Sequence, residues 1–551
     1  MSKANLLFKN ANVLTLDSHN RCAGSVAVAN GRIVGIWKER EPSKSDLEIT
    51  AQTNVVDLKG ATLIPGFIDT HNHILAYGQM KGQLNCGTPP NQSIKDIIEA
   101  IRARAKEIPH GQWIQGYGYD DTLLHEKRHL TRTDLDEAAP HNPVLIMHTS
   151  GHLAAANSLA LRMGGLADDA SDPQGGHYGR DEKGRLNGVL YESAAMHPVM
   201  NETPKLTVED MTGFLREAAK DYVAQGITTN SDAAIFGLDD LAAHLKAAEE
   251  DINPIRTQLM IMHHLLREGG AFGGYTAAQL DKEIQERSGG MAKLDSAKMF
   301  QDGSIQGLTG ALRKPYYQNS DVYGDLIHSQ KVFNEEVADL HQRGFRIATH
   351  GNGDRAIGSI LEAYEYALGK HKRSDHRHRI EHVQAATHED IARMKALKVA
   401  GSFFINHVYY WGDRHEKIFL GPERARRISP LADAVKSDLL FTLHSDCPIT
   451  PISPLFSVWA AVNRLTKEGR VLGPEQRIDV ITALKSMTIY GAKLNFSEGV
   501  SGSIEVGKQA DFAVLEADPT TVKHEEIKDI AVLATYIGGE PVYGHETIKT
   551  S

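Results

Sequence analysis

Apolar runs and amphipathic runs alternate along most of the chain. Eight runs rich in apolar and β-branched residues predict strands, and helical patterns lie between them. NEEVADLHQRG before the fifth run and HEDIARMKAL after the sixth are examples of these helical patterns. Eight strands that alternate with helices predict a (β/α)8 barrel of the TIM type. The predicted strands cover residues 66–73, 226–233, 255–262, 294–304, 344–353, 377–384, 398–407 and 438–446.

The two ends of the chain share another pattern. Residues 5–64 carry Val- and Ile-rich runs separated by Asn-Gly and Lys-Gly pairs, which are typical of hairpins. Similar runs return near the C-terminus, in GSIEVGKQADFAVLE and AVLATYIGGEPVYG. Because chain ends commonly lie close together, we predict a composite β-sandwich domain from residues 1–64 and 496–551. The barrel then occupies residues 65–495.

The first and second predicted strands are separated by about 150 residues, several times the length of one βα unit. The excess predicts an insertion over about residues 78–215. Loops that follow barrel strands lie at the C-terminal face, where active sites form. We therefore expect the insertion to cover the active site and to shape the substrate pocket.

Composition narrows the classes of protein. With 60 Lys and Arg against 70 Asp and Glu, the formal charge is −10, which argues against a nucleic-acid surface. No apolar run approaches the length of about 18 residues that spans a membrane, and we expect no signal peptide. Three scattered cysteines fit a reducing cytoplasm. We expect a cytoplasmic protein with a small-molecule substrate and no nucleic-acid or membrane partner; a homodimer is expected only because it is the commonest assembly.

The candidate chemistry starts from the 27 histidines. In FIDTHNH, His71 and His73 are two residues apart near the end of the first predicted strand. Because strand side chains alternate between faces, both imidazoles point the same way and supply half of a zinc site. Asp69 lies on that face, one step deeper, where it can orient a ligand.

Other titratable residues lie in or at the end of later predicted strands. His350, His382 and Asp446 end the fifth, sixth and eighth, and Lys298 lies in the fourth. Strand ends converge at the top of a barrel, so these groups and the His71–His73 pair are expected to share one small volume. Singly, each is a common hydrogen-bonded strand-end residue; together they indicate a functional site.

These residues and several longer segments resemble the amidohydrolase superfamily of metal-dependent hydrolases. GFIDTHNH is similar to its first-strand signature, and GSIEVGKQADFAVLEADP to its terminal β segment. WIQGYGYDDTLL, the run from LTRTDLDEAAP to HLAAANSLAL, GRLNGVLYESA, AKMFQDGS and HGNGDRAI resemble the amidohydrolase-3 group. That group includes the YtcJ-like proteins and N-substituted formamide deformylase. The resemblance runs from about residue 5 to 545.

The resemblance implies the following metal ligands: His71, His73, Lys298, His350, His382 and Asp446. It implies that Asp446 also acts as general base and that, in a binuclear centre, Lys298 is carboxylated and bridges two ions. A carbamate has two anionic oxygens, whereas an ammonium has no lone pair for a metal. The alternative is an unmodified Lys298 paired with Asp302 in a mononuclear centre. Zn²⁺ is the expected ion, as one or two per chain.

Further residues are weaker candidates. His152 is expected to polarise the scissile carbonyl, with helix capping or packing as the alternative. Tyr117 and Asp120 are expected to line the pocket, unless they only form a turn. His444 replaces the glycine frequent in the group; it either reaches the pocket or packs below the site. Asp302 and Glu381 are expected to support the ligands.

The leading prediction is a metal-dependent hydrolase that cleaves an amide-type C–N bond of a small N-substituted amide or formamide. A deaminase or cyclic-amide hydrolase on the same scaffold is the second reading, because the ligands do not reveal pocket shape. A catalytically silent scaffold or regulatory protein is the third, and loss of metal ligands would favour it.

Overall fold

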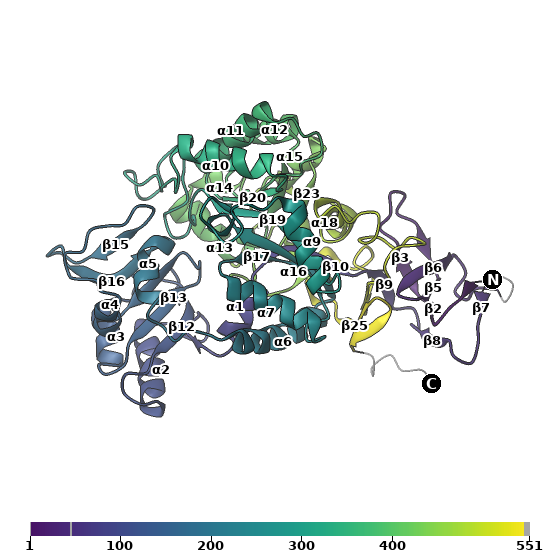
Figure 1. The fold of residues 1–551 in the computed structure, drawn as a ribbon, viewed down its shortest axis with the longest axis horizontal. Helices are drawn as coiled ribbons and strands as arrows, with labels where there is room; N and C mark the ends of the chain where they lie inside the picture. The colour runs from purple at the N-terminus through teal and green to yellow at the C-terminus, as the bar shows by residue number, and fades with distance from the viewer. Residues whose placement is uncertain (1, 44–46, 545–551) are drawn as a thin grey trace.

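The centre of the molecule is a sheet of eight parallel strands, each hydrogen-bonded to its neighbour in chain order. A computed structural model describes residues 2–43 and 47–544. The strands are β10 (Phe67–Asn72), β17 (Ile227–Ile235), β18 (Arg256–Met262), β19 (Ala292–Phe300), β20 (Ile347–Gly351), β21 (Arg379–His382), β22 (Ala400–Phe403) and β23 (Phe441–Leu443). Every predicted strand overlaps one of them, with β17 and β19 each extending two residues beyond the predicted range, and the predicted (β/α)8 barrel is confirmed (Figure 1).

The ring of strands closes between β23 and β10. The Thr70 and Thr442 hydroxyl oxygens lie 2.8 Å apart across the junction. Just beyond β23, the backbone N–H of Asp446 donates to the carbonyl of His71 at 3.1 Å. The N–H of His73 donates to the carbonyl of Cys447 at 2.8 Å. The chain after β23 therefore continues the strand pairing and brings the first and last strand ends together.

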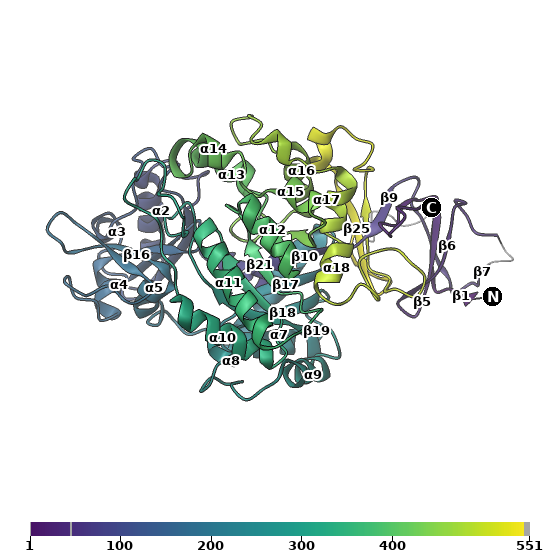
Figure 2. The same ribbon diagram turned by 90° about the horizontal axis from the view of Figure 1, so that it is seen from above.

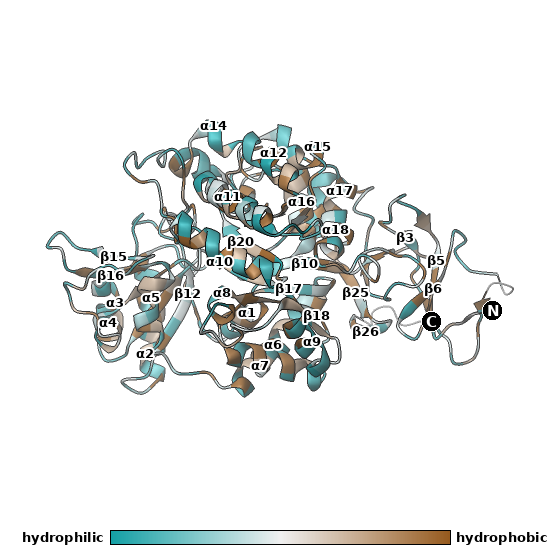
Figure 3. Ribbon diagram, turned by 45° about the horizontal axis from the view of Figure 1, so that its top comes forward, coloured by the Kyte–Doolittle hydropathy of each residue, from teal (hydrophilic) through white to brown (hydrophobic). Residues whose placement is uncertain are grey.

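Amphipathic helices surround the barrel. They include α6 (Val208–Ala224), α7 (Leu238–Glu249), α9 (Ala277–Arg287), α10 (Gln330–Gln342), α11 (Asp354–Lys370) and α12 (His388–Leu397). The two helical patterns quoted from the sequence correspond to α10 and α12. Thr387 begins α12 with a capping box, because its hydroxyl accepts from the N–H of Asp390, whose carboxylate accepts in return. Hydrophobic and hydrophilic residues alternate along these helices in Figure 3, as one-sided packing on a barrel requires.

A second sheet follows β10 and lies beside the barrel (Figures 1 and 2). Its order is β11-β12-β13-β14-β16-β15. The strands are β11 (Leu84–Asn85), β12 (Ile114–Tyr119), β13 (Val144–His148), β14 (Leu153–Ala156), β15 (His177–Arg180) and β16 (Leu186–Tyr191), with α2 (Ile94–Glu107) among its helices. Residues 208–215 of the predicted insertion instead begin α6, where Met211 and Leu215 join the barrel core. The C-terminal end of the insertion was predicted too late in the chain, because α6 and the inserted helices have the same amphipathic pattern.

Strands from both chain ends form two further sheets. One has the order β6-β5-β2-β8 and the other β26-β25-β24-β9-β3-β4. The second includes β3 (Asn12–Leu14), β4 (Cys22–Ala23), β25 (Val532–Ile537) and β26 (Glu540–Tyr543). β24 (Phe512–Leu515) pairs antiparallel with β9 (Thr62–Pro65), so the two ends of the chain share a sheet. Phe8 of β2 (Leu6–Lys9) packs edge-on against Phe512 and Tyr536, with ring centroids 5.5 and 4.9 Å apart. One core therefore joins the two sheets, as a β-sandwich requires.

One turn expectation for this region is wrong. Asn30 and Gly31, at φ 50° and 73°, do join the paired strands β5 (Ser25–Ala29) and β6 (Arg32–Trp37). Lys59 and Gly60 have φ of 49° and 92°, but they connect β8 (Asn54–Asp57) to β9, which lie in different sheets. Lys59 and Gly60 therefore form a connection between two sheets and not a hairpin turn.

None of the helices in the described ranges combines the length and the apolar character that crossing a membrane demands.

Candidate active site

A cavity of about 1260 Å³ opens between the C-terminal edge of the barrel and the second sheet. Both parts line it, with Tyr117 and Met147 from the second sheet and Trp411 and Ile449 from the barrel. The six groups for which the resemblance implied metal binding all line this one cavity: His71, His73, Lys298, His350, His382 and Asp446.

The parallel register explains why these distant residues meet. His71 is the second-to-last residue of β10 and His73 directly follows that strand. Lys298, His350 and His382 lie near the C-terminal ends of β19, β20 and β21. Because all eight strands run in the same direction, their C-terminal ends form one rim.

Asp446 is the group on which the histidines converge. Its Oδ1 lies 3.3 Å from Nε2 of His71 and 3.2 Å from Nε2 of His73. Its Oδ2 lies 3.9 Å from Nδ1 of His382. Burial alone would raise the pKa of Asp446, but electrostatic attraction to His382 and the close approach of His71 and His73 hold it well below its usual range. Asp446 is therefore an anion surrounded by imidazoles.

His350 and His382 form the other side of the cluster. Nδ1 of His350 lies 3.1 Å from Nε2 of His382, and their ring centroids are 4.5 Å apart. Burial lowers the pKa of both imidazoles well below the usual range. Both rings are therefore neutral at physiological pH and retain a nitrogen lone pair, which is the form that binds metals.

Lys298 is fully buried, and its Nζ has no hydrogen-bond partner among the described residues. Its Nζ lies 4.8 Å from the ring centroid of Phe300. Burial is the largest influence on its pKa and lowers it to about 8. An amine that is buried, unpaired and easily deprotonated is unusual for a structural lysine.

The alternative ion pair between Lys298 and Asp302 is wrong. The carboxylate of Asp302 instead accepts backbone N–H groups of Ala311 at 2.9 Å, Asn352 at 3.0 Å and Gly353 at 2.8 Å. Its Oδ1 lies 3.7 Å from Nε2 of His350. Burial raises the pKa of Asp302 to about 7. Asp302 therefore fixes the loop after β20 and lies against a histidine of the cluster.

Glu381 orients His71. Its Oε2 lies 2.7 Å from Nδ1 of His71, which directs Nε2 of that ring towards Asp446. Arg379 forms an ion pair with Glu381 and another with Asp295, at 3.0 Å in the second case. Arg379 and Asp295 were not found from the sequence, although Arg379 stands two residues before Glu381 on the same strand face.

Asp69 acts on the backbone rather than on an imidazole. Its Oδ2 accepts from the hydroxyl of Ser445 at 2.6 Å, and its Oδ1 accepts from the N–H of His71 at 3.2 Å. Burial raises the pKa of Asp69 to about 6. This carboxyl therefore ties the end of β10 to the segment after β23.

His444 does not line the cavity, so of its two alternatives the structure shows packing below the site and not a place in the substrate pocket. Its Nε2 lies 3.1 Å from Nδ1 of His382, and its Nδ1 lies 2.9 Å from the Ser402 hydroxyl. Its ring stacks on His71 with centroids 4.8 Å apart. Alternation explains the correction, because His444 and Asp446 share a strand face but His444 lies one step deeper in the barrel.

His152 reaches the cluster from the second sheet. Its ring centroid lies 5.0 Å from that of His350, and its Nδ1 lies 2.8 Å from Oε2 of Glu192. Burial lowers the pKa of His152, but the charge of Glu192 and the hydrogen bond to it outweigh burial and raise the pKa overall. His152 therefore lines the cavity beside the cluster and has a carboxylate partner on its other side.

Glu192 was missed by the sequence analysis. It begins α5 (Glu192–Met200) with a φ of 67°, a left-handed conformation that costs a non-glycine residue about 1–3 kcal/mol. Its backbone N–H donates to the carbonyl of His152 at 2.8 Å. Gly303 permits its approach, since a Cβ there would lie 2.1 Å from Oε1 of Glu192. Such strain at a carboxylate that contacts the cavity-lining His152 indicates a functional role.

Tyr117 and Asp120 both line the cavity, as expected. Asp120 is not free for a ligand, because its Oδ2 lies 2.6 Å from Nη1 of Arg414. Arg414 ends α13 (His407–Arg414) on the barrel. The pair therefore joins the second sheet to the barrel across the cavity.

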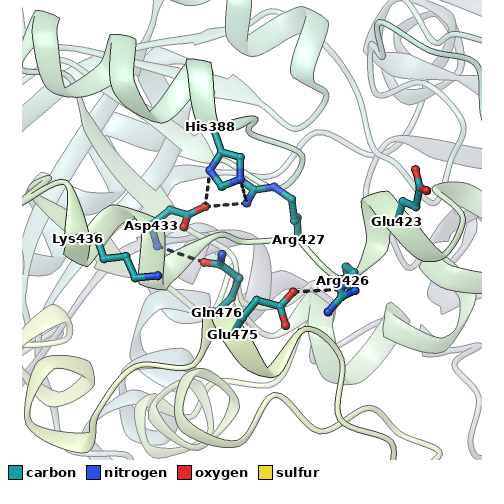
Figure 4. A pocket seen from close by; sticks show the side chains of 8 residues that line it. All are labelled: His388, Glu423, Arg426, Arg427, Asp433, Lys436, Glu475 and Gln476. Carbon is teal, nitrogen blue, oxygen red and sulfur yellow. Dashed lines mark hydrogen bonds and ion pairs between the residues drawn. The ribbon is translucent and has the colours of Figure 1, made fainter.

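A smaller depression of about 360 Å³ lies elsewhere, beside α12 and α15 (Leu431–Lys436) (Figure 4). Asp433 pairs with His388 at 3.2 Å and Arg427 at 2.8 Å, and Arg426 pairs with Glu475 at 3.0 Å. These ion pairs occupy most of the charged groups of this depression, and the cluster of imidazoles and carboxylates lies in the larger cavity, so we place the active site there.

Comparisons with known proteins agree with this fold. The profile of the amidohydrolase family matches residues 54–543. N-substituted formamide deformylase of Arthrobacter pascens is 29% identical over 545 residues, covering 97% of each chain. The putative amidohydrolase YtcJ of Bacillus subtilis (strain 168) is 27% identical over 503 residues, covering 89% of this chain and 91% of YtcJ.

Among solved structures, an uncharacterized metal-dependent hydrolase of Pyrococcus horikoshii has the same fold. It superposes with a TM-score of 0.74 at 24% identity and covers 94% of this chain and 99% of its own. Fold and site thus define a barrel hydrolase with an imidazole and carboxylate cluster at its C-terminal rim. The chain belongs to the amidohydrolase family. It is a hydrolase that acts on carbon–nitrogen bonds.

Proposed function

We propose that this protein hydrolyses the C–N bond of a small N-substituted amide or formamide, using water activated by one or two divalent metal ions, with Zn²⁺ as the expected ion. The observation that carries the proposal is the convergence of four histidines, Asp446 and an unpaired Lys298 on one cavity. A silent scaffold has no need to retain such a set.

The residues present fit a metal centre. Oδ1 of Asp446 and Nζ of Lys298 are buried polar atoms without hydrogen-bond partners among the described residues. Such atoms are costly unless an ion or a water satisfies them. One donor atom from each of His71, His73 and Asp446 lies within 4.8 Å of the other two. These three groups would hold one ion, and His350 and His382 would contribute to a second.

Carboxylation of Lys298 would complete a binuclear centre. The neutral amine attacks CO₂, so that an N–C bond forms, one C=O bond opens and the amine loses a proton. The resulting carbamate has two anionic oxygens able to span ions about 3.5–4 Å apart. Its position beneath the cluster, with no competing ion pair, supports this assignment.

When bound, a zinc ion supplies a water of pKa near 7 and polarises a carbonyl oxygen. The chain's own residues manage the protons. Asp446 is ionised and faces the cavity, so it can accept a proton at a carboxylate oxygen and return it to the departing amine nitrogen. This transfer gives the amine a neutral form in which it leaves.

His152 is placed to stabilise negative charge on the substrate carbonyl oxygen. Glu192 accepts from Nδ1, which leaves Nε2 as the second donor of a protonated ring. A donor of this kind, fixed before reaction, typically contributes a factor of about 10²–10³ in kcat. Glu192 is a positioning residue in this scheme because it acts through His152.

The cavity size supports a substituted amide. Its volume of about 1260 Å³ far exceeds what formamide itself would fill. Apolar side chains also line the cavity: Leu145, Met147, Met196, Trp411 and Ile449. They would contact the substituent on nitrogen. One relative is named as a deformylase of N-substituted formamides, in agreement with this shape.

The test is a screen of N-substituted formamides and N-acyl amines with the zinc-loaded protein, with separate assays of carboxylate, amine and ammonia. We expect equal amounts of carboxylate and amine, and no turnover by His71→Ala or Asp446→Asn. Release of ammonia would contradict the proposal and indicate a deaminase. Hydrolysis of cyclic amides alone would indicate a ring-opening enzyme. A zinc-loaded protein inert towards all of them would favour a scaffold. Cytoplasmic location and a homodimer stay predictions.

A further inference from the structure

A second group of metal-ligating side chains lies outside the cavity described above. His263 begins α8 (His263–Leu266) directly after β18, His328 precedes α10, and Glu336 lies in the second turn of α10. One donor atom from each lies within 4.8 Å of the other two. None of the three lines the active-site cavity. Residues far apart in sequence therefore form a compact His, His, Glu cluster on another part of the barrel.

The cluster contains two polar atoms that the protein leaves unsatisfied. Nδ1 of His263 and Oε2 of Glu336 are buried and have no hydrogen-bond partner among the described residues. The closest approach between His328 and Glu336 is 3.8 Å, which is too long for a hydrogen bond. Two orphaned atoms within one small cluster indicate that something outside the protein bonds to both.

Neighbouring residues hold His328 in place. Phe333 stacks on the ring of His328 with centroids 5.7 Å apart and planes 13° apart. Gln301, at the end of β19, accepts from the N–H of His328 at 3.2 Å and donates to its carbonyl at 3.1 Å. The side chains of His328 and Glu336 remain 16% and 24% exposed. The cluster is therefore preorganised and open to water on one side.

The geometry favours coordination over ion pairing. Nδ1 of His263 has no hydrogen-bond partner among the described residues, and His328 lies 3.8 Å from Glu336, beyond hydrogen-bond reach. A neutral imidazole offers a nitrogen lone pair to a metal. The positive charge of Arg267 acts on both imidazoles and opposes a further cation, so coordination must exceed that repulsion.

We propose that His263, His328 and Glu336 form a second divalent metal site, selective for Zn²⁺ or a similar borderline ion, with water as the remaining ligand. Two imidazoles and one carboxylate are a common zinc ligand set, and the exposed side leaves room for the fourth ligand. The ion would tie α8 to the start of α10 and brace the loops that follow β18 and β19. The site is independent of the proposed reaction.

The test is zinc bound per chain, measured by elemental analysis after equilibration with zinc alone and removal of free metal. The variant His71→Ala/His73→Ala/Asp446→Asn weakens the active-site centre and serves as background. On this background His263→Ala and Glu336→Gln should each lower bound zinc by about one ion per chain. His264→Ala is the matched control, because its Nε2 bonds to the carbonyl of Phe236 instead of joining the cluster, and it should keep the ion.

Thermal unfolding gives a second measurement. Zinc should raise the Tm of the background variant and of its His264→Ala derivative, but not of the Glu336→Gln derivative, because an ion bound only to the native state stabilises it. Glu336→Gln is nearly isosteric, so it decides the matter if His263→Ala does not fold. Equal zinc content and equal zinc-induced shifts in the Glu336→Gln and control derivatives would overturn the proposal and assign the space to water.

Discussion

His71 and Asp446 are joined twice, once through the backbone and once through their side chains. The N–H of Asp446 donates to the carbonyl of His71 at 3.1 Å, and Nε2 of His71 lies 3.3 Å from Oδ1 of Asp446. The first contact belongs to barrel closure and the second to the proposed metal centre. Closing the barrel and assembling the site are therefore one structural event.

Removing either side chain should abolish turnover without unfolding the barrel. The backbone contact survives in His71→Ala and Asp446→Asn, so we expect native circular dichroism with kcat/KM lowered by a factor of at least about 10³. The measurement is kcat/KM of the purified, zinc-loaded variants with the amide that the wild type prefers. His388→Ala is a suitable control, since that side chain is 75% exposed and remote from the cavity. Retention of wild-type kcat/KM by both site variants would refute the assignment.

Lys298 should carry a carboxyl group. Protein equilibrated with ¹³C-labelled bicarbonate should show a carbamate carbon by NMR that is absent from Lys298→Ala. That variant should also lose about one bound ion and at least about 100-fold in kcat, because it lacks the bridging oxygens. Lys298→Arg retains a cation but forms no carbamate and should behave like Lys298→Ala. A wild type without the signal, together with an unchanged metal content in Lys298→Ala, would point to a mononuclear centre.

Glu192 should matter through the protonation of His152. Glu192→Gln keeps a hydrogen-bonding oxygen but removes the charge that raises the pKa of His152. We expect kcat to fall by about 10–100-fold, with the limb of the pH–rate profile that reports loss of the protonated donor moved to lower pH. His152→Asn should lose activity and that limb together. A lower kcat with an unmoved profile would reduce Glu192 to a structural role.

His444 should strengthen metal binding although it does not touch the cavity. It contacts Nδ1 of His382, and such outer contacts typically change metal affinity by about 10–100-fold. Competition with a chromophoric chelator would measure weaker zinc binding by His444→Ala. Ser402→Ala, which removes the partner on the other ring nitrogen, should change affinity in the same direction by less. Affinities equal to that of the wild type would show that His444 only fills space.

Acid should destabilise the protein through three histidines below the barrel. Nδ1 of His378 accepts the N–H of Ile347 at 3.0 Å, and Nδ1 of His376 accepts the N–H of His378 at 2.9 Å. His378 is also 2.9 Å from His341. Burial lowers the pKa of His376 to about 4 and that of His378 well below its usual range.

The direction in which stability changes with pH follows from these lowered pKa values. The unfolded state, with histidine pKa near 6.5, binds protons that the folded state excludes. Stability is therefore complete above about pH 6.5 and falls as the pH drops towards the folded pKa values, by at most about 1.4 kcal/mol per pH unit for each group. Chemical denaturation at pH 7.5, 6 and 5 measures the slope. His376→Gln should reduce it, whereas the exposed His388→Ala should not; equal slopes in all three proteins would contradict the explanation.

The barrel, the composite sandwich and the strand ends that carry the cluster could be predicted from the sequence. Strand and helix periodicities are local, so eight strands could be located along the chain. Because parallel strands end at one rim, His350, His382 and Asp446 could be brought together without coordinates. The end of the insertion and the Lys59–Gly60 connection were misplaced, because local patterns do not state which body an element packs against.

Which side chains face one another could be seen only in the folded protein. The contact of Glu192 with His152, the network from Arg379 to His71 and the place of His444 below the site depend on side chains meeting across elements. The His263–His328–Glu336 cluster likewise joins two loops that nothing in the sequence relates. Contacts of this kind depend on packing between distant segments, where a difference of one strand step or one helical turn moves a side chain from the cavity to the core.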